Sequence, residues 1–127
     1  MTPSPDSTDG RQTHKDVKSY ALIDPAVKAP YLEFYKVTYS ERDAALDRKT
    51  KELIAIAASL AFNCQNCMDG HIKKAIRDGA TREEISETIA VTLGVAAAAV
   101  VDRSDLAGAR LGMAFEDIPS KKDKPAS

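Results

Sequence analysis

The sequence lacks tryptophan, and aromatic residues make up only 6% of its 127 residues. Because strands favour aromatic and β-branched residues, this scarcity argues against a strand-rich fold. An excess of charge of one sign is also missing, with 18 Lys and Arg against 19 Asp and Glu. Nucleic-acid-binding proteins usually carry a basic patch or stripe, so we expect no nucleic-acid partner.

Long hydrophobic runs are absent as well. The longest apolar stretch, residues 91–101, falls short of the ~18 residues that a membrane span requires. The first sixteen residues are rich in Pro, Ser, Thr and Asp, where a secretory signal needs an apolar run. We therefore expect a cytoplasmic protein that does not contact a membrane.

Cysteine is rare: the chain has two, Cys64 and Cys67, and His71 follows them one helical turn later. A domain of this length can bury a core without disulfide support, so a structural staple is not needed. In a reducing compartment a C-x-x-C pair indicates catalysis, redox sensing or metal binding.

The remaining pattern is helical, and we predict an all-α fold with a single domain over residues 17–118. Residues 1–16, which include His14, and residues 119–127 are polar, contain proline and are predicted to be disordered tails. Asp24 and Pro25 are typical of a helix start, followed by one helix or by two short ones broken near Pro30.

The central residues predict two more helices. A broad apolar stripe begins after Asp47 and indicates a helix to about residue 62, buried on most sides in its C-terminal half. Asn63 is a suitable cap for the next helix, which carries both cysteines and ends at Gly79.

The C-terminal half of the sequence predicts a long helix and a short one. Thr81 and Glu84 form a capping-box pattern, and the helix that follows runs to about Arg103. A last helix is predicted to start at a Ser104 cap. The small residues at 96–99, with Gly94, favour a contact between copies of the chain.

On a helix, residues three and four apart share a face, so Cys64, Cys67 and His71 should line one stripe. The first turn of a helix favours a thiolate through its dipole and its N–H groups, and two cysteines there can reach disulfide distance. If the preceding helix packs antiparallel, Glu52 lies about 16 Å and His71 about 12 Å from the turn, a mismatch that one water can bridge.

Other chemistries remain open for these residues. The two thiols and His71, with Glu52 as a fourth ligand, could hold zinc, although the second half of a typical zinc pattern is missing. We expect no cofactor and no metal. Each side chain also has a plain structural interpretation, as a buried thiol, a core histidine or a solvated helix carboxylate.

The spacing E-x11-C-x2-C-x3-H, formed by Glu52, Cys64, Cys67 and His71, resembles the signature of the alkylhydroperoxidase D and carboxymuconolactone decarboxylase superfamily. The resemblance covers residues 30 to 115 and implies a helical bundle that assembles as a homotrimer or homohexamer. It implies an antioxidant oxidoreductase that reduces hydroperoxides, and in which a lipoyl-bearing or thioredoxin-like protein regenerates the cysteine pair.

The resemblance also implies roles: Cys67 as the attacking thiolate, Cys64 as the resolving thiol, and Glu52 with His71 as a proton relay. General experience with C-x-x-C pairs favours instead the first cysteine as the more exposed and more acidic one. Apolar neighbours in the sequence suggest an organic hydroperoxide as the substrate; these are Ile56, Leu60, Phe62 and Ile72.

Two other functions are compatible with the sequence. One is a carboxymuconolactone-decarboxylase-like activity on a small lactone acid, which would need a cationic clamp but no pair of thiols. The other is a non-catalytic redox sensor or adaptor whose assembly changes when Cys64 and Cys67 pair.

Overall fold

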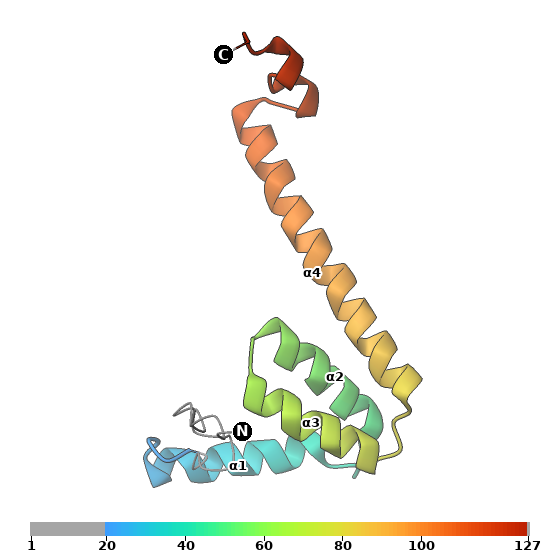
Figure 1. Cartoon of the computed structure of the whole chain (residues 1–127). Coiled ribbons are helices and arrows are strands. Elements are labelled where there is room, and N and C mark those ends of the chain that lie inside the picture. Colours follow the sequence, from blue (N-terminus) through green and yellow to red (C-terminus); the bar gives the residue numbers. More distant parts are fainter. Residues whose placement is uncertain (1–19, 127) are drawn as a thin grey trace, which may run out of the picture. The chain divides into compact units, whose positions relative to one another are not determined.

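In the computed structural model, which describes residues 20–126, every regular element is helical, as predicted (Figure 1). The predicted tail 1–16, with His14, lies outside the described residues. The α-helices are α1 (Pro25–Tyr39), α2 (Arg48–Ala61), α3 (Gln65–Arg77) and α4 (Arg82–Leu111). Two short 3-10 helices follow, η2 (Phe115–Asp117) and η3 (Lys121–Asp123).

The chain divides into two compact units, residues 1–51 and residues 52–127. The first contains α1 and the opening turn of α2, and the second contains the rest of α2 together with α3, α4 and both 3-10 helices. All the residues singled out above as candidates for chemistry belong to the second unit. The predicted domain limits, 17 and 118, stay a prediction.

Helix α1 starts as predicted. The Asp24 carboxylate accepts a hydrogen bond of 2.7 Å from the Ala26 N–H, and Pro25 occupies the first helical position, where its missing N–H costs nothing. Of the two alternatives for this region, the structure has one continuous helix, because Pro30 lies inside α1 without ending it.

Helix α2 is capped by Asp47, whose carboxylate accepts the Thr50 N–H at 2.7 Å. It is buried along one stripe only, and the prediction that its C-terminal half is buried on most sides is wrong. Leu60 is 41% exposed and Phe62, just past the helix end, is 84% exposed. The buried residues are Glu52, Ala55, Ile56 and Ser59, spaced by three and four as one helical face requires.

The turn between α2 and α3 differs from the prediction in one position. Asn63 is not the cap of α3 but takes a left-handed conformation, with φ of +53°, and closes α2. The Asn63 N–H donates to the Leu60 carbonyl and the Cys64 N–H to the Ser59 carbonyl, the bonds of a Schellman motif. Asparagine suits both positions, and the cap passes to Cys64.

The predicted end of α3 and start of α4 are confirmed. Gly79 takes the left-handed conformation, with φ of +92°, just after α3. Thr81 and Glu84 form both halves of the capping box: the Thr81 hydroxyl accepts the Glu84 N–H, and the Glu84 carboxylate accepts the Thr81 N–H.

Helix α4 continues through the position where a new helix was expected. Ser104 does not cap a helix; its hydroxyl donates 2.7 Å to the Val101 carbonyl within α4. Serine can bond to the preceding turn in this way, which removes the reason for a break. The helix ends instead at Gly112, with φ of +62°, and a Cβ on Gly108 would lie 2.9 Å from the Met113 carbonyl oxygen.

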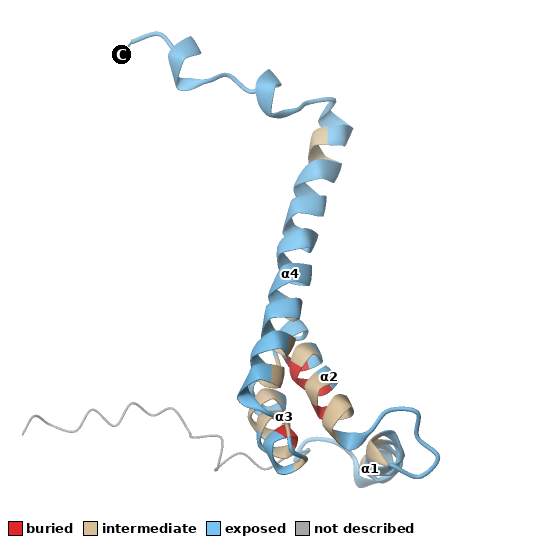
Figure 2. Ribbon diagram, turned by 90° about the vertical axis from the view of Figure 1, so that its right-hand side faces the viewer, coloured by how far each residue is buried: buried red, intermediate tan, exposed pale blue. Residues whose placement is uncertain are grey.

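No residue of α4 is buried, although its middle is the most apolar part of the chain (Figure 2). By length and composition α4 could cross a membrane, since its most apolar 18-residue stretch has a mean hydropathy of 1.6. One such helix is weak evidence of a span, because the core helix of a soluble protein meets the same condition. The expectation of no membrane contact stays a prediction.

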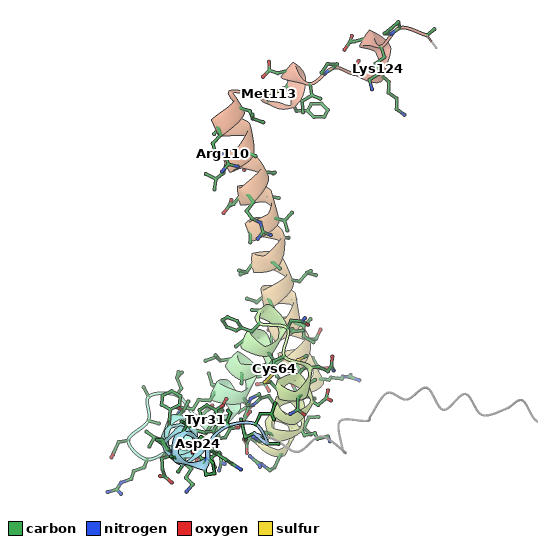
Figure 3. The ribbon with its side chains drawn as sticks, turned by 90° about the vertical axis from the view of Figure 1, so that its left-hand side faces the viewer. Asp24, Tyr31, Cys64, Arg110, Met113 and Lys124 are labelled. Atoms are coloured by element: carbon green, nitrogen blue, oxygen red, sulfur yellow. A yellow bond between two sulfur atoms is a disulfide. The ribbon has the colours of Figure 1, made fainter. Side chains whose placement is uncertain are left out.

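The chain beyond α4 is exposed throughout its described part and carries η2 and η3. Figure 3 shows Arg110 and Met113 at the end of α4 far from Cys64. The Ser120 hydroxyl accepts the Lys122 N–H at the start of η3, so this segment holds local turns. Its predicted disorder stays a prediction.

Candidate active site

Helices α2 and α3 lie side by side and bring Glu52 and His71 together, 19 positions apart in the sequence. Glu52 Oε2 lies 2.6 Å from His71 Nδ1, with 2% of the Glu52 side chain and 13% of the His71 side chain exposed. The contact is direct, where the sequence left room for a bridging water. A buried carboxylate needs such a partner, since an unpaired buried charge is strongly unfavourable.

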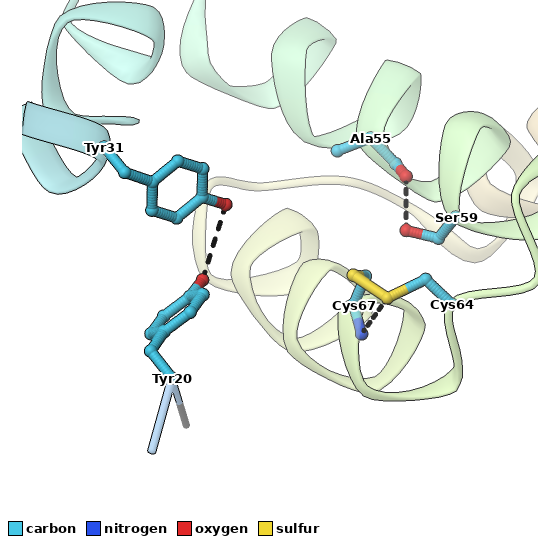
Figure 4. The surroundings of a disulfide bond; sticks show 6 residues. All are labelled: Tyr20, Tyr31, Ala55, Ser59, Cys64 and Cys67. Atoms are coloured by element: carbon cyan, nitrogen blue, oxygen red, sulfur yellow. Dashed lines mark hydrogen bonds between the residues drawn. A yellow bond between two sulfur atoms is a disulfide. The ribbon is translucent and has the colours of Figure 1, made fainter. Parts of the chain in front are cut away.

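Cys64 and Cys67 form a disulfide at the start of α3, with their Cα atoms 5.2 Å apart (Figure 4). This separation lies in the range expected from the spacing of the two residues. Cys64 is the N-cap, and its sulfur accepts the Cys67 N–H at 3.3 Å. A helix N-terminus therefore faces the Cys64 sulfur and would stabilise negative charge on it.

The two sulfur-bearing residues differ in exposure: Cys67 is exposed and Cys64 is half-buried. This order is the reverse of the general expectation that the first cysteine of such a pair is the more exposed. His71 lies one turn beyond Cys67 on the same face of α3. The more exposed cysteine is thus the one nearer to the Glu52–His71 pair along the helix.

Sequence reasoning missed Ser59, which anchors the turn before Cys64. Its side chain is buried and its hydroxyl donates 2.6 Å to the Ala55 carbonyl (Figure 4). Its own carbonyl accepts the Cys64 N–H at 2.9 Å. The only sequence signal was a serine inside the apolar stripe of α2, where a buried hydroxyl requires a partner.

The apolar walls expected around the cysteines are only partly available. Ile56 is fully buried between helices and cannot line an accessible site, whereas Leu60 lines a groove elsewhere. That apolar groove, of about 770 Å³, lies between α2 and α4 within the second unit. It is lined by Ile54, Ala57, Ala58, Leu60, Ala61, Ile89, Val91, Thr92, Leu93, Val95, Ala96 and Ala99.

Metal ligation has no ready geometry in residues 20–126, where no three His, Cys, Asp or Glu side chains are grouped to hold an ion. The two sulfurs are bonded to each other in this structure. Zinc binding through Cys64 and Cys67 would therefore require the reduced pair, since thiolates are the ligands.

A family model, the carboxymuconolactone decarboxylase family, matches residues 25–107. The chain belongs to this family. The match confirms the superfamily resemblance seen in the spacing of Glu52, Cys64, Cys67 and His71. It covers both compact units described above.

Two relatives in sequence are uncharacterised and leave the activity open. An uncharacterised protein of the cox locus of Paracoccus denitrificans is 43% identical over 79 residues, 62% of this chain and 66% of that protein. An uncharacterised protein of Cupriavidus necator is 36% identical over 52 residues, 41% of this chain and 46% of its own length. The chain thus spans less than two thirds of either relative.

Two solved structures share the fold. The apo form of a carboxymuconolactone decarboxylase family protein from Legionella pneumophila is 34% identical, with a TM-score of 0.52 over 56% of this chain and 62% of that one. A protein from Methanobacterium thermoautotrophicum is 28% identical, with a TM-score of 0.59 over 65% of this chain and 93% of its own. Both matches agree with the helical architecture.

Proposed function

We propose that the chain is a thiol-dependent hydroperoxidase and disulfide reductase of the alkylhydroperoxidase D type. The observation that carries the proposal is the part-buried Glu52–His71 contact of 2.6 Å, one helical turn from the exposed Cys67 of a disulfide-bonded pair. A nucleophile, a base and a group that orients the base are the parts that covalent catalysis by a thiol requires.

In the reduced enzyme, His71 accepts the thiol proton of Cys67. Because Nδ1 faces the Glu52 carboxylate, the neutral ring carries its proton on that nitrogen and is basic at Nε2. The carboxylate then stabilises the imidazolium that forms, as the acidic member of a triad does. The buried pair thus keeps a base in place beside a sulfur that solvent and substrate can reach.

The proposed cycle has three balanced steps. The Cys67 thiolate attacks the terminal oxygen of the hydroperoxide, the O–O bond breaks, and the alkoxide leaves as an alcohol with the proton held on His71. Cys64 then attacks the Cys67 sulfenic acid, water leaves, and the disulfide seen here forms. A dithiol of a lipoyl-bearing or thioredoxin-like protein finally reduces the disulfide by two electrons and is itself oxidised.

The test is turnover of cumene hydroperoxide with dithiothreitol by the full chain and by the Cys67→Ser and Cys64→Ser variants. We expect multiple turnovers for the wild type and none for Cys67→Ser. The Cys64→Ser variant should react once and stop at a sulfenic acid trapped by dimedone. Oxidation without repeated turnover in the wild type would instead favour the redox-sensor alternative.

The family match also keeps a second activity open, decarboxylation of a small lactone acid. That reaction would need no thiol, so it should survive in a Cys64→Ser/Cys67→Ser double variant. Turnover of a carboxymuconolactone by this variant at the wild-type rate would replace the peroxidase proposal.

We propose further that the groove between α2 and α4 is covered by α4 of a second copy, in a homotrimer or homohexamer. Leu93 and Val95 are 68% and 67% exposed, and a helix that is apolar on all sides is normally buried. At Gly94 an added Cβ would meet nothing within 4 Å, so no contact of the described chain requires this glycine. Small residues of this kind allow two helix backbones to approach closely.

A second copy suits α4 better than a lipid bilayer. Residues 88–101 carry no charged side chain, and they span only about 21 Å at 1.5 Å per residue. The hydrocarbon core of a bilayer is about 30 Å thick, and Glu87 and Asp102 flank this stretch. A surface made mostly of alanine and valine fits the apolar groove that lies beside it.

Light scattering at micromolar concentration tests the assembly, and we expect a trimer or hexamer. A vesicle flotation assay with phosphatidylcholine and phosphatidylglycerol should show no binding. A monomer that floats with vesicles would assign α4 to a membrane instead.

A further inference from the structure

Gly70 occupies the middle of α3 without a conformational reason. Gly79 and Gly112 have positive φ values, and Gly108 is held close to a backbone oxygen, but none of these reasons applies to Gly70. A Cβ built on it would meet nothing within 4 Å. Glycine destabilises a helix interior relative to alanine, so the absent side chain has a cost that the packing of residues 20–126 does not explain.

Gly70 lies in the same row of α3 as the two cysteines of the disulfide. Cys64, Cys67 and Gly70 are each three residues apart and form one row along α3, so the row that passes through the two cysteines continues to Gly70. A helical side chain leans toward the N-terminus and covers the turn before its own Cα. A side chain at position 70 longer than alanine would therefore extend over Cys67.

The two sides of Cys67 thus differ. His71 lies about 40° around the helix from Cys67, on the flank toward Glu52, and Gly70, which is also half-buried, lies about 60° around on the opposite flank. In a thiol–disulfide exchange the attacking thiolate approaches opposite the sulfur that leaves. If Cys64 is the leaving sulfur, the approach to Cys67 comes from the side of position 70.

The electrostatics favour that direction of exchange. The Cys64 sulfur already accepts the Cys67 N–H at the N-terminus of α3, which stabilises a departing thiolate. Cys64 is also the less exposed of the two, so an incoming group meets Cys67 first. A better leaving group and better access both assign the attack to Cys67.

We propose that Gly70 is a specificity-determining residue, which keeps the approach to Cys67 open for a dithiol borne by a reductant protein. The inference rests on the proposed function. One thiolate of the reductant attacks the Cys67 sulfur, the Cys64–Cys67 bond breaks, and Cys64 leaves as a thiolate that takes up a proton. The second thiol of the reductant then attacks the mixed disulfide, releases Cys67, and leaves the reductant oxidised by two electrons.

The experiment compares a small and a protein-borne reductant on the oxidised full chain. The wild type and the Gly70→Ala and Gly70→Leu variants are mixed with dithiothreitol, with reduced thioredoxin, or with a dihydrolipoyl-bearing carrier domain. Loss of the disulfide is followed by rapid quenching, alkylation and mass spectrometry. Lys73→Leu is the matched control, because it adds the same side chain to an exposed position one step further along the cysteine row, six residues and about 9 Å beyond Cys67.

The comparison uses whichever of thioredoxin and the dihydrolipoyl-bearing domain reduces the wild-type disulfide faster. For Gly70→Leu we expect the rate of reduction by that protein to fall by about tenfold or more, and the rate with dithiothreitol to change by less than about twofold. Gly70→Ala should melt a few degrees higher than the wild type and keep most of its rate, which separates access from folding. Lys73→Leu should react like the wild type.

Three results would overturn the inference. One is an equal slowing of both kinds of reductant in Gly70→Leu, and another is no slowing at all. The third is a wild-type disulfide that dithiothreitol reduces but neither protein does. In each of these cases peroxide turnover with dithiothreitol leaves the proposed function standing. The proposed function itself fails if the wild type shows no such turnover.

Discussion

Two parts of the second unit differ in how far their residues are buried. Helices α2 and α3 carry all the residues of the described chain that are buried, and these include Glu52. Helix α4 has a longer apolar surface, but none of its residues is buried. The described residues of the second unit therefore support the candidate site, whereas they bury no residue of its most apolar helix.

This difference separates two kinds of stability. The position of His71 depends on a small contact between two helices, which the single chain forms. The described residues of the second unit leave α4 exposed, and we propose that a second copy covers it. Substitutions between α2 and α3 should therefore change stability or catalysis, whereas substitutions in α4 should change the oligomeric state.

The largest expected effect is on assembly, from Val95→Asp. The charge would enter the proposed contact between copies, where an unpaired carboxylate is strongly unfavourable. We expect a monomer by light scattering that still forms the Cys64–Cys67 disulfide. Ser86→Asp is the control, because it adds the same charge to α4 outside the groove. An oligomer that persists in Val95→Asp would place the contact elsewhere.

The second effect is on folding, from Ile56→Ala. Ile56 is fully buried, and its truncation should lower the free energy of unfolding by about 3 kcal/mol. Leu106→Ala, at a position of α4 that is 62% exposed and outside the groove, should cost less than about 0.5 kcal/mol. Urea unfolding of both variants checks the comparison. Equal losses in the free energy of unfolding would mean that Leu106 of α4 contributes as much to the stability of the fold as the buried Ile56.

The third effect is on catalysis, from Glu52→Gln. The amide keeps the shape of the carboxylate but cannot stabilise an imidazolium, so we expect peroxide turnover to fall about tenfold to a hundredfold. The dependence of the rate on pH should change with it, which a merely structural role would not produce. Glu87→Gln, an exposed change on α4, is the control. An unchanged rate and pH profile in Glu52→Gln would remove the relay from the mechanism.

These outcomes bear on what the sequence could predict. Interactions between residues close in the sequence were predictable, because one short sequence pattern contains both partners. The capping box of Thr81 and Glu84 is an example. The all-α fold and the family were predictable for the same kind of reason. The roles of Cys67, Cys64, Glu52 and His71 stay predictions that the experiments above address.

Positions where one residue suits two geometries were not predictable. Asn63 suits both a helix cap and a left-handed helix end, and in the structure it takes the second, with the hydrogen bonds that close α2. Ser104 suits both a cap and a bond to the preceding turn. The direct Glu52–His71 contact also lay beyond straight-helix arithmetic, because the offset between two packed helices depends on the side chains between them.

The smallest expected effect concerns Asp47, which caps α2 five residues before the buried Glu52. Hydrogen bonds from the side chain and backbone of Thr50 lower the pKa of Asp47 below its usual value. A carboxyl whose pKa is lowered by folding stabilises the folded state above its unfolded pKa, and this contribution is lost as the pH falls through the folded pKa.

Asp47→Ala should therefore be less stable than the wild type at neutral pH, and the difference between the two should shrink as the pH falls below about 4. Urea unfolding of both proteins at pH 7 and pH 3 measures this double difference, in which the titration of all other carboxyls cancels. Because Asp47 is exposed, the effect should also be small beside that of Ile56→Ala. A difference that grows in acid would mean that Asp47 stabilises α2 in its protonated form, and that its charge does not hold the start of the helix that carries Glu52.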